Sequence, residues 1–163
     1  MTENHQLEIF DEWVNKHRGL LFKVIRAYAI DKDDQQDLFQ EIVVQLWRSI
    51  PGFREKCAVS TWIYRIALNT SIKWMGRERR FSANRRPLEH ARLVLHETPG
   101  DDRLAWLYEQ IVTLNEIDRS ITLLLLDGFS YKEMAAMLGI SESHVGVKIN
   151  RIKKYLISKI DKP

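Results

Sequence analysis

The chain has 163 residues, of which 45% are hydrophobic and 29% are charged, so it can bury a core and is not a disordered tail. A single cysteine excludes an internal disulfide framework, no apolar run reaches the roughly 20 residues of a membrane helix, and the first residues lack the pattern of a signal peptide. We therefore expect a soluble, cytoplasmic protein with one domain or two small ones.

The net charge of +3 is informative only when it is resolved along the chain. Residues 73–92 hold seven basic and two acidic side chains, and residues 144–163 hold six and one, so each segment carries a net +5. Residues 1–50 and 93–143 are acidic, with net charges of −3 and −6. Two basic segments that are separated by an acidic one indicate two contacts with a polyanion, although two solvated helix faces give the same pattern.

Helical periodicity dominates the first half of the chain. Apolar residues at three- and four-residue steps predict one amphipathic helix over residues 10–28, with His17 as a core histidine. A second helix is predicted over residues 34–49, capped within the acidic stretch that begins at Asp31 and stopped by the Pro-Gly pair at 51–52. Its apolar residues cover more than one face, which indicates either a central helix or a helix that also meets a partner.

A third helix, capped by Ser60, is predicted over residues 61–80, and it carries a polar stripe. The members of the stripe recur at steps of four residues and finally three: Arg65, Asn69, Lys73, Arg77 and Arg80. Aromatic side chains among cations can stack unpaired bases and hold the flanking phosphates. Trp62 and Trp74 lie on this helix, and each of them taken singly is better explained as a core residue.

The periodicity fades over residues 81–103, which predicts a linker with an r.m.s. span of roughly 26 Å as flexible coil. Helices resume over residues 104–114, and Asn115 is predicted to cap the next one. The sequence has no Gly-rich phosphate loop, no Cys/His metal spacing and no Ser-His-Asp arrangement. A calcium-loop pattern beginning at Asp31 fails at its sixth and twelfth positions. We therefore expect no enzyme activity, no cofactor and no metal.

The most specific motif is a helix-turn-helix over residues 130–157. Ser130 begins a capping box, Gly139 allows the left-handed turn, and Ser141 caps the second helix. The stripe of that helix predicted to be buried comprises Val145, Ile149, Ile152, Leu156 and Ile160. Its opposite side is basic and hydrogen-bonding, with Ser143, His144, Lys148, Asn150, Arg151 and Lys154. Such a helix fits a DNA major groove, whereas a purely structural helical hairpin is the alternative.

Four motifs occur in a characteristic order: Asp37-Leu-Phe-Gln-Glu41, Ser60-Thr-Trp-Ile63, Arg65-Ile-Ala-x-Asn69 and Asp127-Gly-Phe-Ser-Tyr-x-Glu-Met-Ala-x-x-Leu-Gly-Ile-Ser141. In this order the chain resembles an extracytoplasmic-function (ECF) sigma factor, the minimal two-domain class of bacterial transcription initiation factor. The resemblance implies an all-α fold with a region 2-like domain over residues 1–80, a flexible linker over 81–103, and a region 4-like helix-turn-helix domain over 104–163.

The resemblance also implies partners and site residues. Core RNA polymerase would bind Asp37, Leu38, Gln40, Glu41, Leu46 and Trp47. The opened strand of the promoter −10 element would contact Phe53, Trp62, Arg65, Asn69, Lys73, Arg77 and Arg80. The −35 element, as duplex DNA, would be read by Ser141, Ser143, His144, Lys148, Asn150, Arg151 and Lys154. Members of this family are often held inactive by an anti-sigma factor, which would be a further partner.

The chain departs from the usual family pattern at several positions. Lys73 replaces an Asp, Asn115 replaces a Pro, and Gly146 and Val147 stand where Lys or Arg and Ser are common. The −35 sequence therefore does not follow from the resemblance. Two other functions remain open at this point. One is a one-component helix-turn-helix regulator that binds a palindrome without polymerase, and the other is a helical adaptor with solvated basic segments.

Overall fold

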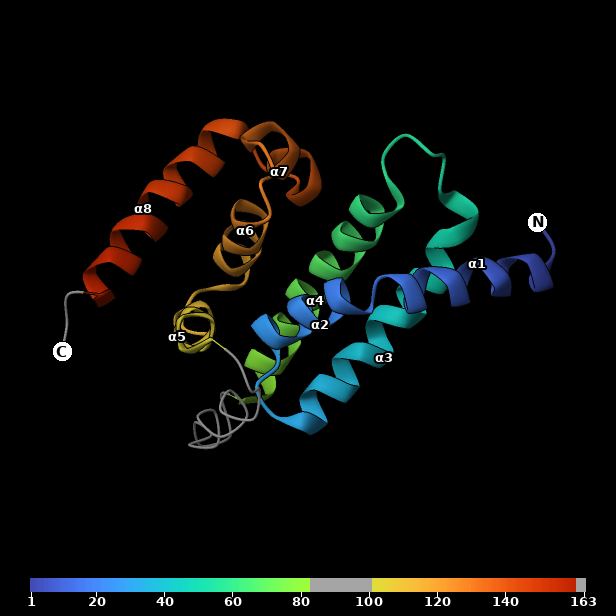
Figure 1. Ribbon diagram of the computed structural model, residues 1–163, viewed down its shortest axis with the longest axis horizontal. Coiled ribbons are helices and arrows are strands. Elements are labelled where there is room, and N and C mark those ends of the chain that lie inside the picture. The colour runs from blue at the N-terminus through green and yellow to red at the C-terminus, as the bar shows by residue number, and fades with distance from the viewer. Residues whose placement is uncertain (83–100, 161–163) are drawn as a thin grey trace. The chain divides into compact units, whose positions relative to one another are not determined.

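The computed structural model describes residues 1–82 and 101–160, and these fold into helices only, which confirms the all-α prediction (Figure 1). The chain forms two compact units, Met1–Glu97 and Thr98–Pro163. Most of the predicted linker lies outside the described residues, so the domain boundaries stay a prediction. None of the described helices combines the length and the apolar composition that crossing a membrane requires.

The chain begins with two helices where the sequence predicted one. Helix α1 spans Glu3–Lys16 and α2 spans Arg18–Tyr28, and His17 between them has φ −117° and ψ 27°. Gly19 lies just after this break, and glycine weakens a helix interior. The His17 ring lies 3.0 Å, Nδ1 to O, from the Trp13 carbonyl and is half-buried, so its polar atom is satisfied but the residue is not in the core.

The other helices of the N-terminal unit begin earlier than predicted. Helix α3, Lys32–Ser49, is capped by Asp31, whose Oδ1 accepts the Asp34 N–H at 2.8 Å, and it continues into a 3₁₀ turn, η1, at Ile50–Gly52. Helix α4 spans Val59–Ser82, so Ser60 lies in its first turn and is not the cap. Helices α2, α3 and α4 pack together around fully buried side chains, among them Leu21, Leu38, Ile42, Leu46, Ile63 and Leu68.

The C-terminal unit contains four described helices: α5 at Asp102–Ile111, α6 at Glu116–Leu126, α7 at Tyr131–Leu138 and α8 at Glu142–Ile160. The predicted caps are confirmed. The Asn115 side chain accepts the Asp118 N–H, Ser130 forms the capping box, and Gly139 adopts the left-handed conformation with φ 71°.

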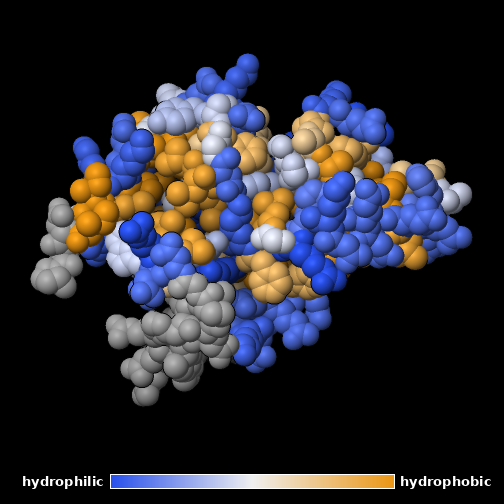
Figure 2. Space-filling model, in the orientation of Figure 1, coloured by the Kyte–Doolittle hydropathy of each residue, from blue (hydrophilic) through white to orange (hydrophobic). Residues whose placement is uncertain are grey.

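The predicted buried stripe of α8 is only partly correct. Val145, Ile149 and Ile152 are buried, but Leu156 is half-buried and Ile160 is 64% exposed. The last turns of α8 extend beyond α6 and α7, and apolar side chains at that end reach the surface (Figures 1 and 2). The core of this unit therefore lies along the first half of α8.

Candidate nucleic-acid interfaces

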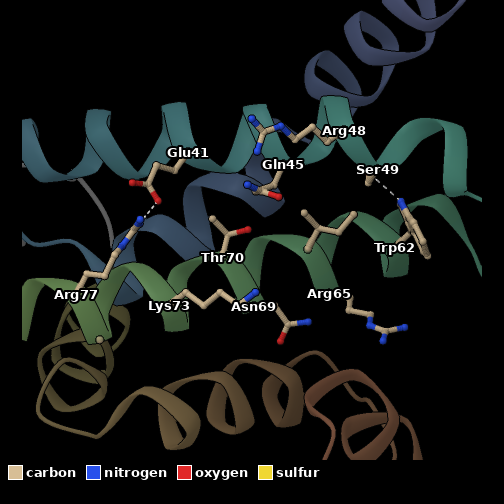
Figure 3. A pocket seen from close by; sticks show the side chains of 12 residues that line it. Glu41, Gln45, Arg48, Ser49, Trp62, Arg65, Asn69, Thr70, Lys73 and Arg77 are labelled. Carbon is tan, nitrogen blue, oxygen red and sulfur yellow. Dashed lines mark hydrogen bonds and ion pairs between the residues drawn. The ribbon is translucent and has the colours of Figure 1, made fainter.

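A groove runs between α3 and α4 of the N-terminal unit (Figure 3). Helix α4 contributes Arg65, Asn69, Lys73 and Arg77, because a spacing of four residues keeps these side chains on one side of a helix. Further lining residues come from both helices and include Glu41, Gln45, Arg48, Ser49, Trp62 and Thr70. The sequence prediction missed Gln45, Arg48 and Thr70, since the stripe was found from spacing along one helix.

The groove is basic, but one of its cations is paired. Arg65 and Lys73 are exposed and Asn69 is half-buried. Arg77 donates a hydrogen bond to Glu41 across the groove, and the two side chains are 52% and 34% exposed. Arg80 continues along the backbone of α4, and its side chain lies outside the described part. An ion pair this exposed is weak, so a phosphate could replace Glu41 as the partner of Arg77.

An aromatic cluster closes one end of this groove. The Phe53 ring lies between Trp13 and Trp62, with ring centroids 5.4 and 5.3 Å away. The Trp62 indole N–H also donates to Ser49 Oγ at 3.2 Å. The cluster anchors the loop of residues 53–58 at its start, and the following residues of the loop remain exposed to solvent.

Trp74 is a core residue, as the simpler interpretation predicted. It is 4% exposed, and its indole N–H donates to Asp37 Oδ2 at 3.0 Å. This bond ties α4 to α3 and gives Asp37 a structural partner within the chain.

The residues predicted to bind polymerase fall into two groups. Leu38 and Leu46 are fully buried and cannot touch a partner, which corrects their assignment. Gln40 is exposed, and Trp47 is half-buried, with its ring in a T-shaped contact with the Phe10 ring at a centroid distance of 5.6 Å. The prediction failed for the two leucines because a motif on one helix does not show which of its faces packs inward.

The sequence prediction also missed exposed apolar residues of α3. Phe39 is 38% exposed and Val44 is 45% exposed. Val44 lies on the same side of the helix as Gln40 and Trp47, and Phe39 lies at the edge of that side. We call these four residues the outer face of α3. The signal was present in the sequence, since the apolar residues of this helix cover more than one side.

Carboxylates crowd the N-terminal end of α3. Burial raises the pKa of Asp34 to about 6, with further contributions from the nearby Asp31, Glu78 and Asp37. The carboxylates of Asp31, Asp34 and Asp37 thus lie close enough together to disfavour one another's negative charge. No cluster of His, Cys, Asp or Glu in the described ranges 1–82 and 101–160 has the arrangement of a metal site.

Helix α8 presents a polar outward face. Ser143, His144, Asn150, Arg151 and Lys154 are all exposed, as predicted for a helix that enters a groove. Ser141 serves as the N-terminal cap, and its Oγ accepts the His144 N–H at 3.1 Å. Val147 lies among these polar residues and is 49% exposed.

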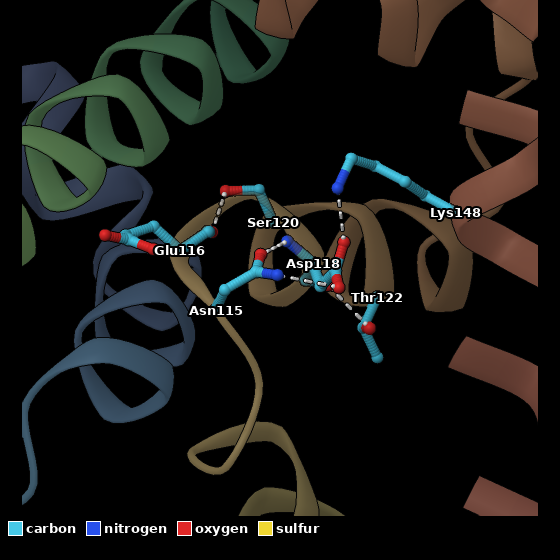
Figure 4. A network of polar contacts seen from close by, with 6 residues as sticks. All are labelled: Asn115, Glu116, Asp118, Ser120, Thr122 and Lys148. Atoms are coloured by element: carbon cyan, nitrogen blue, oxygen red, sulfur yellow. Dashed lines mark hydrogen bonds and ion pairs between the residues drawn. The ribbon is translucent and has the colours of Figure 1, made fainter. Parts of the chain in front are cut away.

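Lys148 does not belong to this outward face (Figure 4). Its Nζ lies 3.1 Å from Asp118 Oδ1 on α6, and the two side chains are only 15% and 18% exposed. Asn115 Nδ2 donates to the other Asp118 oxygen at 3.1 Å, so the carboxylate is held from two sides. Lys148 lies on the flank of α8 next to the buried stripe, which is why acidic α6 can reach it.

Comparisons with known proteins cover both units. Residues 13–81 match the sigma-70 region 2 family, and residues 104–156 match the sigma-70 region 4 family. The ECF RNA polymerase sigma-E factor of Haemophilus influenzae is 29% identical over 93% of this chain and 85% of its own length. The RNA polymerase sigma factor CnrH of Cupriavidus metallidurans is 27% identical over 93% of this chain and 86% of its own.

Two solved structures share the fold. The sigma factor RpoE from Bartonella quintana, crystallised with the anti-sigma factor NepR, gives a TM-score of 0.69 at 18% identity and covers 95% of this chain and 99% of its own. CnrH in complex with the cytosolic domain of CnrY gives a TM-score of 0.62 at 22% identity, and the match covers 95% of this chain and 89% of the CnrH chain. Matches to both regions, in order along one chain, do not favour a one-component regulator.

Proposed function

The chain belongs to the ECF type of RNA polymerase sigma factors, and we propose how its two units divide the work of transcription initiation. It is a transcription initiation factor that directs core RNA polymerase to promoters. In our proposal the N-terminal unit docks on the polymerase and holds the opened −10 strand, and the C-terminal unit reads the −35 duplex. The chain itself catalyses no covalent step and acts in the cytoplasm, beside the polymerase.

The groove between α3 and α4 supports the assignment of the opened strand. Arg65 and Lys73 supply exposed cations, and Arg48 adds one from the opposite helix, so phosphates can be held along the groove. Trp62 at its end offers an aromatic surface, and stacking one base on an aromatic ring contributes roughly 1–3 kcal/mol. That amount offsets the few kcal/mol needed to take a base out of the duplex.

The loop after Phe53 supports a pocket for one flipped base. Its first residue is fixed by two tryptophans, and Glu55 within it has a left-handed backbone with φ 58°. A non-glycine residue in that conformation is strained, and such strain collects at sites that bind ligands.

The outer face of α3 supports the polymerase contact. The apolar side chains next to Gln40 are exposed to water, and covering them with a partner lowers the free energy. Asp37 and Glu41, by contrast, already hydrogen-bond Trp74 and Arg77. We therefore assign docking to Phe39, Gln40, Val44 and Trp47.

An anti-sigma factor is a further proposed partner. It rests on the family and on the RpoE relative, whose solved structure contains the anti-sigma factor NepR. The outer face of α3 is the surface of the N-terminal unit that such a protein would cover to block polymerase binding.

The observation that carries the proposal is the pairing of a concave basic groove with a convex basic helix in a chain that matches sigma regions 2 and 4 in order. The test mixes the purified chain with core bacterial RNA polymerase and a library of promoter fragments and sequences the transcripts. We expect start sites that depend on the chain and share two upstream elements. Transcripts that are unchanged without the chain would refute the proposal.

A further inference from the structure

The centre of the outward face of α8 is apolar. Val147 is 49% exposed, and the exposed side chains of Ser143, Asn150 and Arg151 surround it on the same side of the helix. Residues three and four apart on a helix are neighbours, so all three polar side chains lie next to the valine, and Lys154 follows one turn further along. An isolated apolar side chain therefore occupies the middle of a surface otherwise built for polar contacts.

Packing within the chain does not account for this valine. The adjacent core contacts are made by Val145 and Ile149, which are fully buried. Gly146 faces the Tyr131 ring of α7, since a Cβ there would lie 3.6 Å from the ring. Valine is also a weaker helix former than alanine because of its branched side chain. Neither the core nor the helix requires a branched apolar residue at position 147.

The withdrawal of Lys148 makes Val147 more prominent. A lysine at the next position could reach over the valine, but Lys148 is held on the flank by Asp118 at 3.1 Å. The valine is therefore left uncovered, and because its side chain is short, it touches a base edge only when α8 lies deep in the groove.

We propose that Val147 reads the 5-methyl group of one thymine in the −35 duplex. This inference rests on the proposed function, in which α8 enters the major groove. Among the four base pairs, the major-groove edge carries one apolar feature, the thymine methyl, and apolar side chains recognise it by contact. Val147 is an exposed apolar residue in the first half of α8, where a recognition helix meets bases.

The contact excludes water from two methyl surfaces and demands no hydrogen bond. Cytosine at the same position lacks the methyl and presents an amino group, which the valine would desolvate without a partner. Val147 would thus discriminate against cytosine and uracil at one position, while the polar residues around it read the neighbouring bases and hold the phosphates.

The test uses the full chain bound to core polymerase and a promoter found by transcript sequencing. Each thymine of the −35 element is replaced singly by deoxyuridine, which keeps the hydrogen-bonding groups and removes only the methyl. We expect one replacement to weaken binding about fourfold, the value for exposing one buried methyl group. Val147→Ala should weaken binding to the natural duplex by a similar factor. In this variant the same deoxyuridine replacement should cause no further loss of affinity.

Leu126→Ala is the matched control, because Leu126 is 57% exposed at the end of α6 and lies outside α8. It should keep both the affinity and the response to deoxyuridine. The inference is overturned if no deoxyuridine matters, or if Val147→Ala responds as the natural chain does. If binding does not depend on the −35 element at all, the proposed function of α8 fails, and the inference fails with it.

Discussion

The two basic surfaces each give one cation to a carboxylate on another helix, and the two pairs differ in exposure. In the groove, Arg77 pairs with Glu41, whose side chains are 52% and 34% exposed, whereas Lys148 pairs with Asp118, whose side chains are 15% and 18% exposed. An exposed ion pair contributes about 0–1 kcal/mol to stability, so its members can exchange partners. When the cation of a buried pair moves away, it leaves a buried carboxylate without a compensating charge. The ion pair of the groove is therefore the more adjustable of the two, and the ion pair of α8 is the more fixed.

The largest effect is expected where the cations of α8 are exposed. Arg151→Ala with Lys154→Ala should weaken binding of the −35 duplex by the holoenzyme about ten- to hundredfold, because one bidentate contact to a base is worth about 1–3 kcal/mol. Removing a phosphate contact should also lower the slope of log affinity against log salt by about 0.9. Titrations at several salt concentrations measure both quantities.

The control for that variant is Lys153→Ala, which removes an exposed cation from α8 outside the outward face. It should change affinity by less than about threefold. Equal losses in the two variants would mean that α8 attracts DNA by total charge alone and has no defined face.

Substitutions in the groove should affect a different step of initiation. Arg65→Ala with Lys73→Ala should reduce promoter opening about tenfold or more, since both cations line the groove, and should leave binding of the −35 duplex unchanged. Permanganate reactivity of unpaired thymines reports the opening. Lys16→Ala, at the exposed end of α1, is the control. Loss of −35 binding in the groove variant would show that the two surfaces do not act separately.

The buried pair predicts a stability effect without a DNA effect. Lys148→Met keeps the length of the side chain but leaves the Asp118 carboxylate without its cation, which should cost about 1–3 kcal/mol of unfolding free energy in the C-terminal unit. Hydrogen exchange of α8 amides in the full chain measures that cost. The salt dependence of −35 binding should stay unchanged. A smaller slope of log affinity against log salt concentration would mean that Lys148 contacts the DNA.

The carboxylates of the N-terminal unit predict a pH dependence. The pKa of Asp34 is about 6 in the folded chain against an ordinary value of 3.8, so the folded state binds the proton more tightly than the unfolded state. Below about pH 4 the Asp34 carboxyl is protonated in both states and does not lower the free energy of unfolding. Its ionisation lowers that free energy as pH rises from about 4 to about 6, and the loss stays constant above that range. Asp34→Asn should stabilise the unit by about 1 kcal/mol at neutral pH, since solvent screening reduces the effect.

Urea unfolding of the full chain at several pH values tests this expectation. The gain from Asp34→Asn should shrink toward zero near the lower end of that range, at about pH 4. A gain that is equal in acid and at neutral pH would mean that the amide stabilises the first turn of α3 by some route other than removing charge.

The smallest effect is expected at the exposed pair. Glu41→Gln frees Arg77 for a phosphate and should strengthen binding of the opened promoter by at most about fivefold, in line with about 0.2–1 kcal/mol for an exposed ion pair. In an Arg77→Ala background the same change should have no effect. Weaker binding of core polymerase in Glu41→Gln would instead favour the original prediction, in which Glu41 touches the polymerase.

Local chemistry was predicted well. A cap within the acidic stretch that begins at Asp31, the capping box at Ser130 and the left-handed turn at Gly139 each depend on a few consecutive residues, so the sequence contains all the information they need. The break at His17 was missed because the apolar periodicity continues across it and a single glycine is a weak signal.

The candidate site was predicted less completely. The spacing of Arg65, Asn69 and Lys73 placed them on one side of a helix, and the structure brings them to one groove. Arg48 lies on the opposite wall of the groove, and no pattern in the neighbouring sequence indicates that it faces the groove. A groove made by two helices is a property of their packing, and periodicity along either helix says nothing about the other.

The sequence alone determined the all-α class, the family and the position of the helix-turn-helix, because caps, periodicity and motif order are read along one dimension. Only the tertiary structure decided which members of those motifs reach the surface. It buried Leu38 and Leu46, turned Lys148 toward Asp118, and left Val147 exposed. Each outcome depends on which helix packs against which side, and that choice is made by contacts between residues distant in the chain.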